Sequence, residues 1–447
     1  MQTLKSSLGG LFRTALPLTL VTLAGSAARL ADRLFLGHFS QTALAAVSPA
    51  FVLTGVFSCF ILSVISYSST FVAHNYGQRR HFAAVRTLGQ GLWLAVLSIP
   101  LVFISIPIGN LLISALGHSQ ELTRAETTYF DIVMCAQALA TLSAALSGYF
   151  TAERNARLVG VASVAGCLLN IVLDPLLIFG CGPLPALGLA GAAYAAAAGA
   201  TLSAGLLLRP LVSKRLFTGP LRRHLAFNGK LVFRILRFAL PNSIRGLVEM
   251  AVFYLFICAT AATGETALAV SNICLCVNGI FFAALDGTSR ATAALVGQTR
   301  GSGNDSSTRK IPLQALQLLL LPFAIMAAVY LVGGRSITLL FGDPATDPSS
   351  FAELGLTLFS ILILNDLCET AQNIYGSALL GVGDTRFALR CSLSAHLLVW
   401  TPLLVIFLAY HPSIVCCYLS SVIGRGIHAL LLFWRWRSGK WRNIHLT

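Results

Sequence analysis

The chain has 447 residues, of which 56% are hydrophobic and only 11% are charged, and its mean hydropathy is +0.78. Because soluble domains carry about 25% charged residues, this composition excludes an ordinary soluble protein and predicts a polytopic membrane protein with spans of ~20 residues. The net charge of +15 would suit nucleic acid, but the basic residues lie between apolar segments. That placement favours a role in membrane topology, so we expect no nucleic-acid partner.

About twelve apolar segments follow one another along the chain. They are centred near residues 25, 57, 101, 138, 169, 200, 248, 282, 323, 365, 398 and 425. Lysine and arginine gather in alternate connections, most densely at 209–237, whereas the opposite connections hold only Arg124 and Arg335. By the positive-inside rule, this asymmetry predicts a protein of the cell (inner) membrane with both termini in the cytoplasm.

An internal repeat divides these segments into two sets of six. At one constant offset, the matching pairs are 15–17 with 239–241, 42–45 with 266–269, and Gly77 with Gly301, and a looser echo pairs Pro175 with Pro402. Six spans per repeat let both halves enter the membrane from the same side, as in transporters built from parallel repeats. We therefore predict an all-α polytopic fold with six-helix lobes at 1–212 and 234–447, joined by a basic cytoplasmic linker at 213–233.

The motifs of soluble enzymes are missing from the sequence. It contains no Walker-type phosphate loop, no Gly-x-Ser-x-Gly and no His-Glu-x-x-His. Eleven cysteines form no Cys-x-x-Cys pair, so thiolate metal binding is not expected. We predict that the protein is not an enzyme, carries no cofactor and holds no resident metal. Without a nucleotide site, uphill transport would have to draw on an ion gradient.

Two groups of polar residues lie inside apolar segments without a basic neighbour along the helix. Asn170 and Asp174 are four residues apart and therefore share one helix face. Glu369 has Asp366 three residues before it and Gln372 three residues after it. Each acid costs ~2.5–3.5 kcal/mol at the centre of a span, so such residues usually serve a cavity or a partner. Burial disfavours the ionised form of a carboxyl group, and these positions are predicted proton or cation sites.

Three other intramembrane acids have an arginine within one helical turn. The pairs are Asp32 with Arg29, Glu249 with Arg245, and Asp286 with Arg290. All three can form same-face ion pairs within one helix. For Asp286, near a cytoplasmic end, the structural role is favoured. For Asp32 and Glu249 a role in transport stands beside it, because an ion pair in a solvated cavity can also serve transport.

Several segments resemble the multidrug and toxic compound extrusion (MATE) antiporters, and the resemblance covers nearly the whole chain. The carrying stretches are "LADRLFLGHFSQTALAAVS", "LLNIVLDPLLIFG", "GLAGAAYAAAAGA", "LPNSIRGLVEMAVF", "ATAALVGQTRGSGN" and "GSALLGVGDTR". The resemblance implies two six-helix lobes around a cavity that opens alternately to each side. It also implies export of organic, usually cationic, compounds in exchange for sodium or protons, with drugs and membrane lipid as partners and a monomer as the working unit.

The resemblance also assigns residues to roles. Asp32, Asn170 and Asp174 match the family's ion-coupling positions in the first lobe, and Glu249 and Glu369 match acids of its NorM-type branch. The expected lining of the substrate cavity is Arg29, Arg245, Asp366 and Gln372. Sodium would bind at Asp32 and Asp174 or at Glu249 and Glu369, but Ala196 stands where archaeal members carry a threonine. This difference favours protons as the coupling ion, with sodium as the alternative.

Two other functions remain open at this point. The intramembrane arginines would suit anionic cargo, as in a flippase for lipids or lipid-linked saccharides from the same superfamily. A channel or receptor is the other alternative, although it would need no carboxyl groups that titrate within the membrane.

Overall fold

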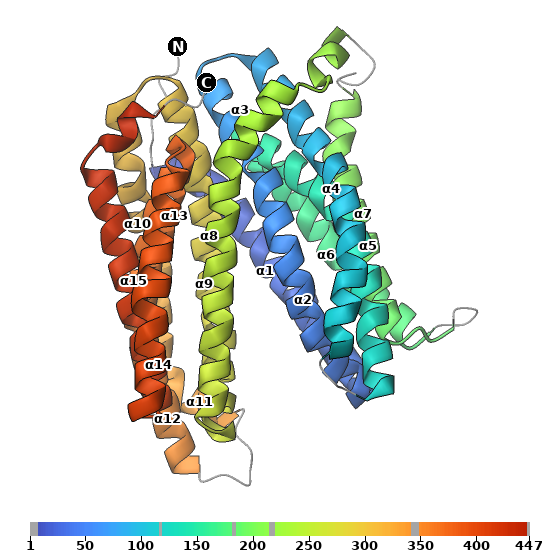
Figure 1. Ribbon diagram of the computed structural model, residues 1–447, viewed down its shortest axis with the longest axis vertical. Coiled ribbons are helices and arrows are strands. Elements are labelled where there is room, and N and C mark those ends of the chain that lie inside the picture. The colour runs from blue at the N-terminus through green and yellow to red at the C-terminus, as the bar shows by residue number, and fades with distance from the viewer. Residues whose placement is uncertain (1–7, 116–118, 181–184, 214–219, 341–347, 445–447) are drawn as a thin grey trace. The chain divides into compact units, whose positions relative to one another are not determined.

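The computed structural model describes residues 8–115, 119–180, 185–213, 220–340 and 348–444, and helices are the only regular elements among them (Figure 1). The α-helices are α1 (Leu8–Phe39), α2 (Gln41–Ser66), α3 (Ser68–Gly77), α4 (His81–Ala115), α5 (Gln120–Ala152), α6 (Ala156–Ile178), α7 (Leu189–Ser213), α8 (Gly229–Ala262), α9 (Glu265–Gly301), α10 (Asp305–Ala328), α11 (Gly334–Leu340), α12 (Pro348–Val382), α13 (Thr385–Ala395), α14 (Thr401–Tyr410) and α15 (Ile414–Arg437). Short 3₁₀ segments η1 (Pro220–Leu225) and η4 (Lys440–Asn443) and π-helical turns η2 (Val329–Gly333) and η3 (His396–Trp400) complete the set.

Twelve stretches of this chain are long and apolar enough to cross a membrane. Nine of them lie within a single α-helix, and three combine consecutive helices: Leu53–Gly77, Asp305–Leu340 and Thr385–Tyr410. Every predicted segment centre falls inside one of the twelve stretches. The predicted all-α polytopic fold is confirmed.

The chain divides into two compact units whose limits follow the repeat. One unit comprises Met1–Thr19 with Ile244–Thr447, and the other comprises Leu20–Ser243. The two division points fall at equivalent positions of the repeat, since each lies two residues beyond a repeated proline, Pro17 or Pro241. Helices α1 and α8 therefore each pass from one unit to the other. The predicted lobes, 1–212 and 234–447, stay a prediction. Their limits assign no helix end to the opposite lobe, whereas α1 and α8 are each divided between the two units.

In the Leu20–Ser243 unit, small residues let α6 and α7 approach closely. The two helices lie side by side (Figure 1). A Cβ atom added at Gly199 would lie 2.4 Å from the Gly166 carbonyl oxygen and 3.3 Å from the Asn170 Cβ. Only glycine fits at this contact, and the contact holds the polar face of α6 against α7.

The second half of the predicted linker is fixed to α4 rather than free. The Gln90 side chain donates to the Ala226 carbonyl at 2.9 Å and accepts from the Asn228 amide at 2.8 Å. Trp93 donates from Nε1 to the Leu225 carbonyl at 3.0 Å. Residues 214–219 of the linker lie outside the described residues. The described part therefore belongs to the Leu20–Ser243 unit.

In the other unit, arginines near the helix ends form ion pairs that join different parts of the chain. Arg435 pairs with Asp384 at 2.7 Å, and Arg300 pairs with Asp305 at 2.6 Å. Trp436 and Trp441 stack with ring centroids 4.7 Å apart, and Trp441 is fully buried. Some residues that the sequence assigns to membrane topology thus also anchor the tertiary structure.

The Gly166–Gly199 contact makes a testable prediction. Gly199→Val should lower the free energy of unfolding by about 1–3 kcal/mol or more, because overpacking pushes α6 and α7 apart. The matched control is Gly205→Val on the same helix, where an added Cβ meets nothing within 4 Å. Thermal unfolding of the purified protein in detergent measures both variants. Equal stability for the two would contradict the close packing.

Candidate functional site

Three polar side chains of α1 and α6 form one group in the Leu20–Ser243 unit, here termed the first-lobe cluster: Asp32, Asn170 and Asp174. Asn170 donates from Nδ2 to Asp174 Oδ1 at 3.3 Å, as their spacing of four residues predicts. Asp32 lies within interaction distance of both. Asn170 and Asp174 are buried, and Asp174 is fully so. The structure therefore brings together the three predicted ion-coupling residues of the first lobe.

Aromatic contacts join α1 to the end of α6 near the first-lobe cluster. The Phe179 ring at the end of α6 lies edge-on to Phe35 at 6.5 Å and to Phe39 at 6.1 Å. Both of these rings belong to α1, within two turns of Asp32. On α6, Pro175 follows Asp174 directly and has no N–H to give to the carbonyl four residues earlier. The first-lobe cluster thus lies where aromatic rings of α1 and α6 are in contact and where one backbone carbonyl of α6 lacks its helical hydrogen bond.

The first-lobe cluster has unused acceptor capacity. Asp32 Oδ1 and Asp174 Oδ2 are buried, and among the described residues neither has a hydrogen-bond partner. Arg29 donates from Nη2 to Ser26 Oγ at 2.9 Å, and its charge acts on Asp32 from a longer distance. The ion pair that the spacing allows between Asp32 and Arg29 is therefore not formed. Two neighbouring carboxyl groups in apolar surroundings cannot both stay ionised at low cost, so the pair is suited to hold a proton or a cation.

The other unit contains a second polar group around Glu249 on α8. Arg245 Nη1 lies 2.7 Å from Glu249 Oε1, which is the ion pair that their spacing predicts. Ser392 of α13 donates to the same oxygen at 3.4 Å. Two histidines, His396 of η3 and His428 of α15, complete the group. The ion pair predicted between Asp286 and Arg290 is also present, at 3.0 Å.

Glu369 on α12 has a basic partner that its own helix does not reveal. Arg425 of α15 forms an ion pair with it, and both side chains are largely buried. The guanidinium of Arg425 also lies over the Trp400 ring, 5.4 Å from its centroid. The view that Glu369 is unpaired holds only along its own helix and is wrong in the folded protein.

Asp366 is held by two neighbours and is shielded from solvent. Asn278 of α9 donates to it at 2.6 Å, and the Tyr330 hydroxyl of η2 donates at 3.4 Å. Asp366 is 1% exposed. Gln372, on the same helix, is also buried, and its Oε1 has no hydrogen-bond partner in the described part of the chain. The assignment of these two residues to a substrate cavity stays a prediction.

Several of these polar residues were not singled out from the sequence, and five of them carry the contacts described above. They are Asn278, Tyr330, His396, Arg425 and His428. The histidines and Arg425 lie within apolar segments, and an ionisable residue in such a segment indicates a candidate functional site from the sequence alone. Nothing in the sequence pattern points to Asn278 and Tyr330, because their hydrogen-bond partner Asp366 is distant in the sequence.

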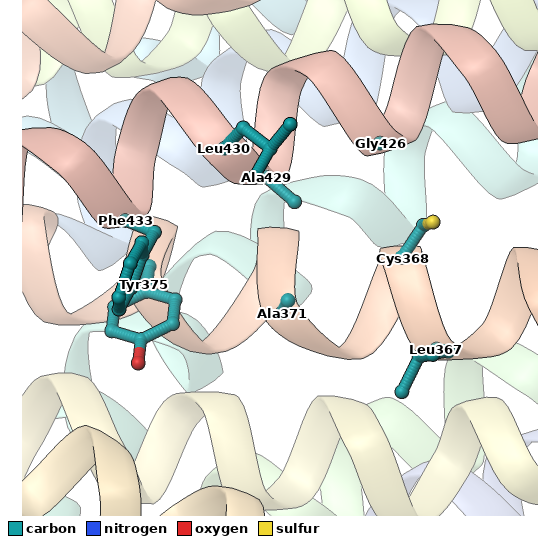
Figure 2. Close-up of a pocket in the computed structure, with 8 residues that line it drawn as sticks. All are labelled: Leu367, Cys368, Ala371, Tyr375, Gly426, Ala429, Leu430 and Phe433. Carbon is teal, nitrogen blue, oxygen red and sulfur yellow. The ribbon is translucent and has the colours of Figure 1, made fainter.

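A pocket lies on an apolar face between α12 and α15, and none of the polar residues named above is part of its lining. It has a volume of about 430 Å³, and Figure 2 shows its lining: Leu367, Cys368, Ala371, Tyr375, Gly426, Ala429, Leu430 and Phe433. Leu367 and Leu430 are more than half exposed. An apolar, exposed face of this kind suits contact with lipid.

Comparison with known proteins supports the resemblance noted in the sequence. The MatE family model matches the chain twice, at residues 17–176 and 241–406. The "Probable multidrug resistance protein NorM" of Deinococcus radiodurans is 30% identical over 404 residues, which cover 88% of this chain and 87% of that protein. The protein of the same name from Bradyrhizobium diazoefficiens is 26% identical over 434 residues, covering 95% and 92%.

Solved structures share the fold. A MATE protein crystallised in complex with MaL6 has a TM-score of 0.87 at 20% identity, with 96% of each chain covered. A MOP superfamily transporter from Pyrococcus furiosus, described as having a binding pocket of reverse polarity, has a TM-score of 0.87 at 20% identity, covering 96% of this chain and 95% of that one.

The twelve spans, the repeat and the buried polar groups define a polytopic α-helical membrane protein of the transporter class. The chain belongs to the MatE family. The family match starts at Pro17 and again at Pro241, which are equivalent positions of the internal repeat and confirm it.

The pair of Glu369 and Arg425 makes the prediction for this site. Arg425→Gln should lower the free energy of unfolding by about 3–5 kcal/mol, because it leaves a buried carboxylate without its counter-charge. The double variant Glu369→Gln/Arg425→Gln should recover most of that loss. Thermal unfolding of the purified variants provides the measurement. A double variant no more stable than Arg425→Gln would show that the ion pair is not what Arg425 contributes.

Proposed function

We propose that this protein is a cation-coupled multidrug efflux antiporter of the inner membrane, which exports organic, mainly cationic, compounds by alternating access. Membership of the MatE family and the multidrug resistance names of its NorM relatives support the transport of drugs. The observation that carries the proposal is the contact of Asp32 with Asp174, each with a buried oxygen that has no partner among the described residues. Such a pair is a store for one positive charge inside the membrane.

A proton is the coupling ion that this pair fits best. One proton between two neighbouring carboxyl groups removes the repulsion between them and satisfies a lone pair that is otherwise orphaned. Asn170 donates to Asp174 Oδ1, so it holds that carboxyl group in one orientation while Oδ2 takes and releases the proton. Loss of the proton restores the repulsion, and this change in energy is what couples ion movement to a conformational change.

Sodium fits the first-lobe cluster less well. A sodium ion needs several converging oxygen ligands, whereas this cluster supplies two carboxyl groups and one amide, and Ala196 offers no hydroxyl. In the other unit, Glu249 and Glu369 already have arginine partners, and sodium would have to compete with both. The driving force for protons is sufficient, since one charge crossing ~100 mV releases ~2.3 kcal/mol, enough for more than a tenfold gradient of cargo.

Transport in reconstituted vesicles tests the coupling. With a pH gradient alone, the parent protein should drive dye transport, and Asp174→Asn should abolish it because the amide keeps the shape but cannot exchange a proton. Asp286→Asn is the matched control, since Asp286 pairs with Arg290 outside the first-lobe cluster, and it should transport like the parent. Transport that persists without a pH gradient and stops when sodium is withdrawn would reverse the choice of ion.

The main alternative is a flippase for lipids or lipid-linked saccharides, which intramembrane arginines would favour. Two of these arginines, Arg245 and Arg425, are engaged with acids in the structure. Arg29 is exposed on α1 and remains the feature most compatible with an anionic cargo.

The cargo is tested by direct competition. Aromatic organic cations should bind and be exported, since the chain has 27 phenylalanines and aromatic faces attract cations by ~0.5–2 kcal/mol. Binding of a fluorescent cationic dye to the purified protein should be displaced by other aromatic cations and not by saccharide-diphosphate lipids. The reverse order of displacement would favour the flippase.

The proposed orientation places both termini in the cytoplasm. Twelve spans put the two ends on the same side, and the basic connections identify that side. In a background without native cysteines, Lys230→Cys should be shielded from a membrane-impermeant thiol reagent added to intact cells. Glu265→Cys, just beyond the opposite end of α8, should react. Both positions are exposed. Labelling at residue 230 and not at 265 would invert the orientation.

A further inference from the structure

A group of three metal-ligand residues lies within the unit that contains Ile244–Thr447. Glu249, His396 and His428 come from three different elements, and their ligand atoms all lie within 4.8 Å of one another. Both histidines are buried. The rings of the two histidines are 5.1 Å apart and nearly perpendicular, so they meet at an edge rather than stack.

The histidines present unused ring nitrogens. His396 Nδ1 lies 2.9 Å from the Ser392 carbonyl, which can only accept, so the proton is on Nδ1 and Nε2 keeps its lone pair. This hydrogen bond is the outer contact that usually fixes a metal-binding histidine. His428 is 0% exposed, and neither of its ring nitrogens has a hydrogen-bond partner among the described residues. A native fold rarely leaves a buried polar side chain in this state without a ligand.

Glu249 is the anionic member of the group, and it is the member that is partly exposed to solvent. Within the described chain, its hydrogen bonds from Arg245 and Ser392 both end on Oε1, which leaves Oε2 for an ion. Its side chain is 25% exposed, so an ion can reach it. The adjacent Arg245 disfavours an ion held by charge alone, such as sodium. An ion that bonds to imidazole nitrogen is affected less.

We propose that Glu249, His396 and His428 form a binding site for a divalent first-row transition metal, with zinc as the best fit. Two imidazoles and one carboxylate are a known zinc ligand set, with a fourth position left for water. Metal–nitrogen bonds of about 2.0–2.1 Å place tetrahedral ligands roughly 3.4 Å apart, so the side chains close by roughly 1 Å on binding.

A metal here would fasten α8 to η3 and α15. These elements already meet through Phe256, whose ring lies 6.2 Å from Trp400 and 5.2 Å from Tyr418. The proposal does not rest on drug export, although a bound metal would occupy Glu249. The expectation of no metal rested on the cysteine pattern, which says nothing about histidine and glutamate.

Cobalt binding to the purified full-length protein tests the site without any transport assay. Co²⁺ should give the visible absorption of a tetrahedral nitrogen and oxygen site at one equivalent per chain, without thiolate charge-transfer bands, and Zn²⁺ should displace it. His396→Gln, His428→Gln and Glu249→Gln should each weaken binding at least ~10–100-fold, the loss that even outer-shell changes cause. His411→Gln, at an exposed histidine, should bind like the parent.

Thermal unfolding keeps the test decisive if a variant of the buried histidine does not fold. Zn²⁺ should raise the unfolding temperature of the parent protein, whereas Na⁺ and Mg²⁺ at the same concentration should not. Absence of Co²⁺ binding, binding that survives the loss of either histidine, or thiolate charge-transfer bands would each overturn the proposal. None of these outcomes bears on drug export, and a failure of drug export would leave the metal site intact.

Discussion

The cost of burying charge among apolar helices governs the arrangement of both units. Every candidate acid obtains a partner within its own unit, because an isolated carboxylate is too costly in these surroundings. Asp174 has an amide and a second carboxyl group, Asp366 has an amide and a phenol, and Glu249 and Glu369 each have an arginine. The difference matters for chemistry, since an arginine fixes a carboxylate in its charged form, whereas an amide leaves it free to change.

The repeat is preserved in the fold but not in these polar residues. At the offset that relates Pro17 to Pro241, Asp32 corresponds to Phe256, and Glu249 corresponds to Gly25. The helices of the two halves could therefore keep their packing while each half acquired its own polar group. Each half therefore has a polar group of its own: the first-lobe cluster contains two carboxyl groups, whereas Glu249 lies beside an arginine and two histidines.

Local periodicity explains what the sequence could predict. The twelve spans depend on runs of apolar residues, and the contacts of Asn170 with Asp174 and Arg245 with Glu249 depend on spacings of four residues within one helix. The ion pair of Glu369 with Arg425 and the hydrogen bond of Asn278 with Asp366 join different helices. Such contacts depend on which helix faces pack together, and one sequence without an alignment does not determine that.

The two π-helical turns lie where the spacing between repeat-related residues changes, although both halves keep six spans. Pro175 and Pro402 are slightly further apart in the sequence than Gly77 and Gly301, so the second half has gained residues between Gly301 and Pro402. Both η2 and η3 lie in that interval, and each takes up one residue more than an α-helical turn does. Pro402, which cannot donate to the carbonyl four residues earlier, stabilises the wider turn at η3. The two turns together can take up two of the three residues that the second half has gained in this interval, and each turn contributes one side chain, Tyr330 or His396, to the interior.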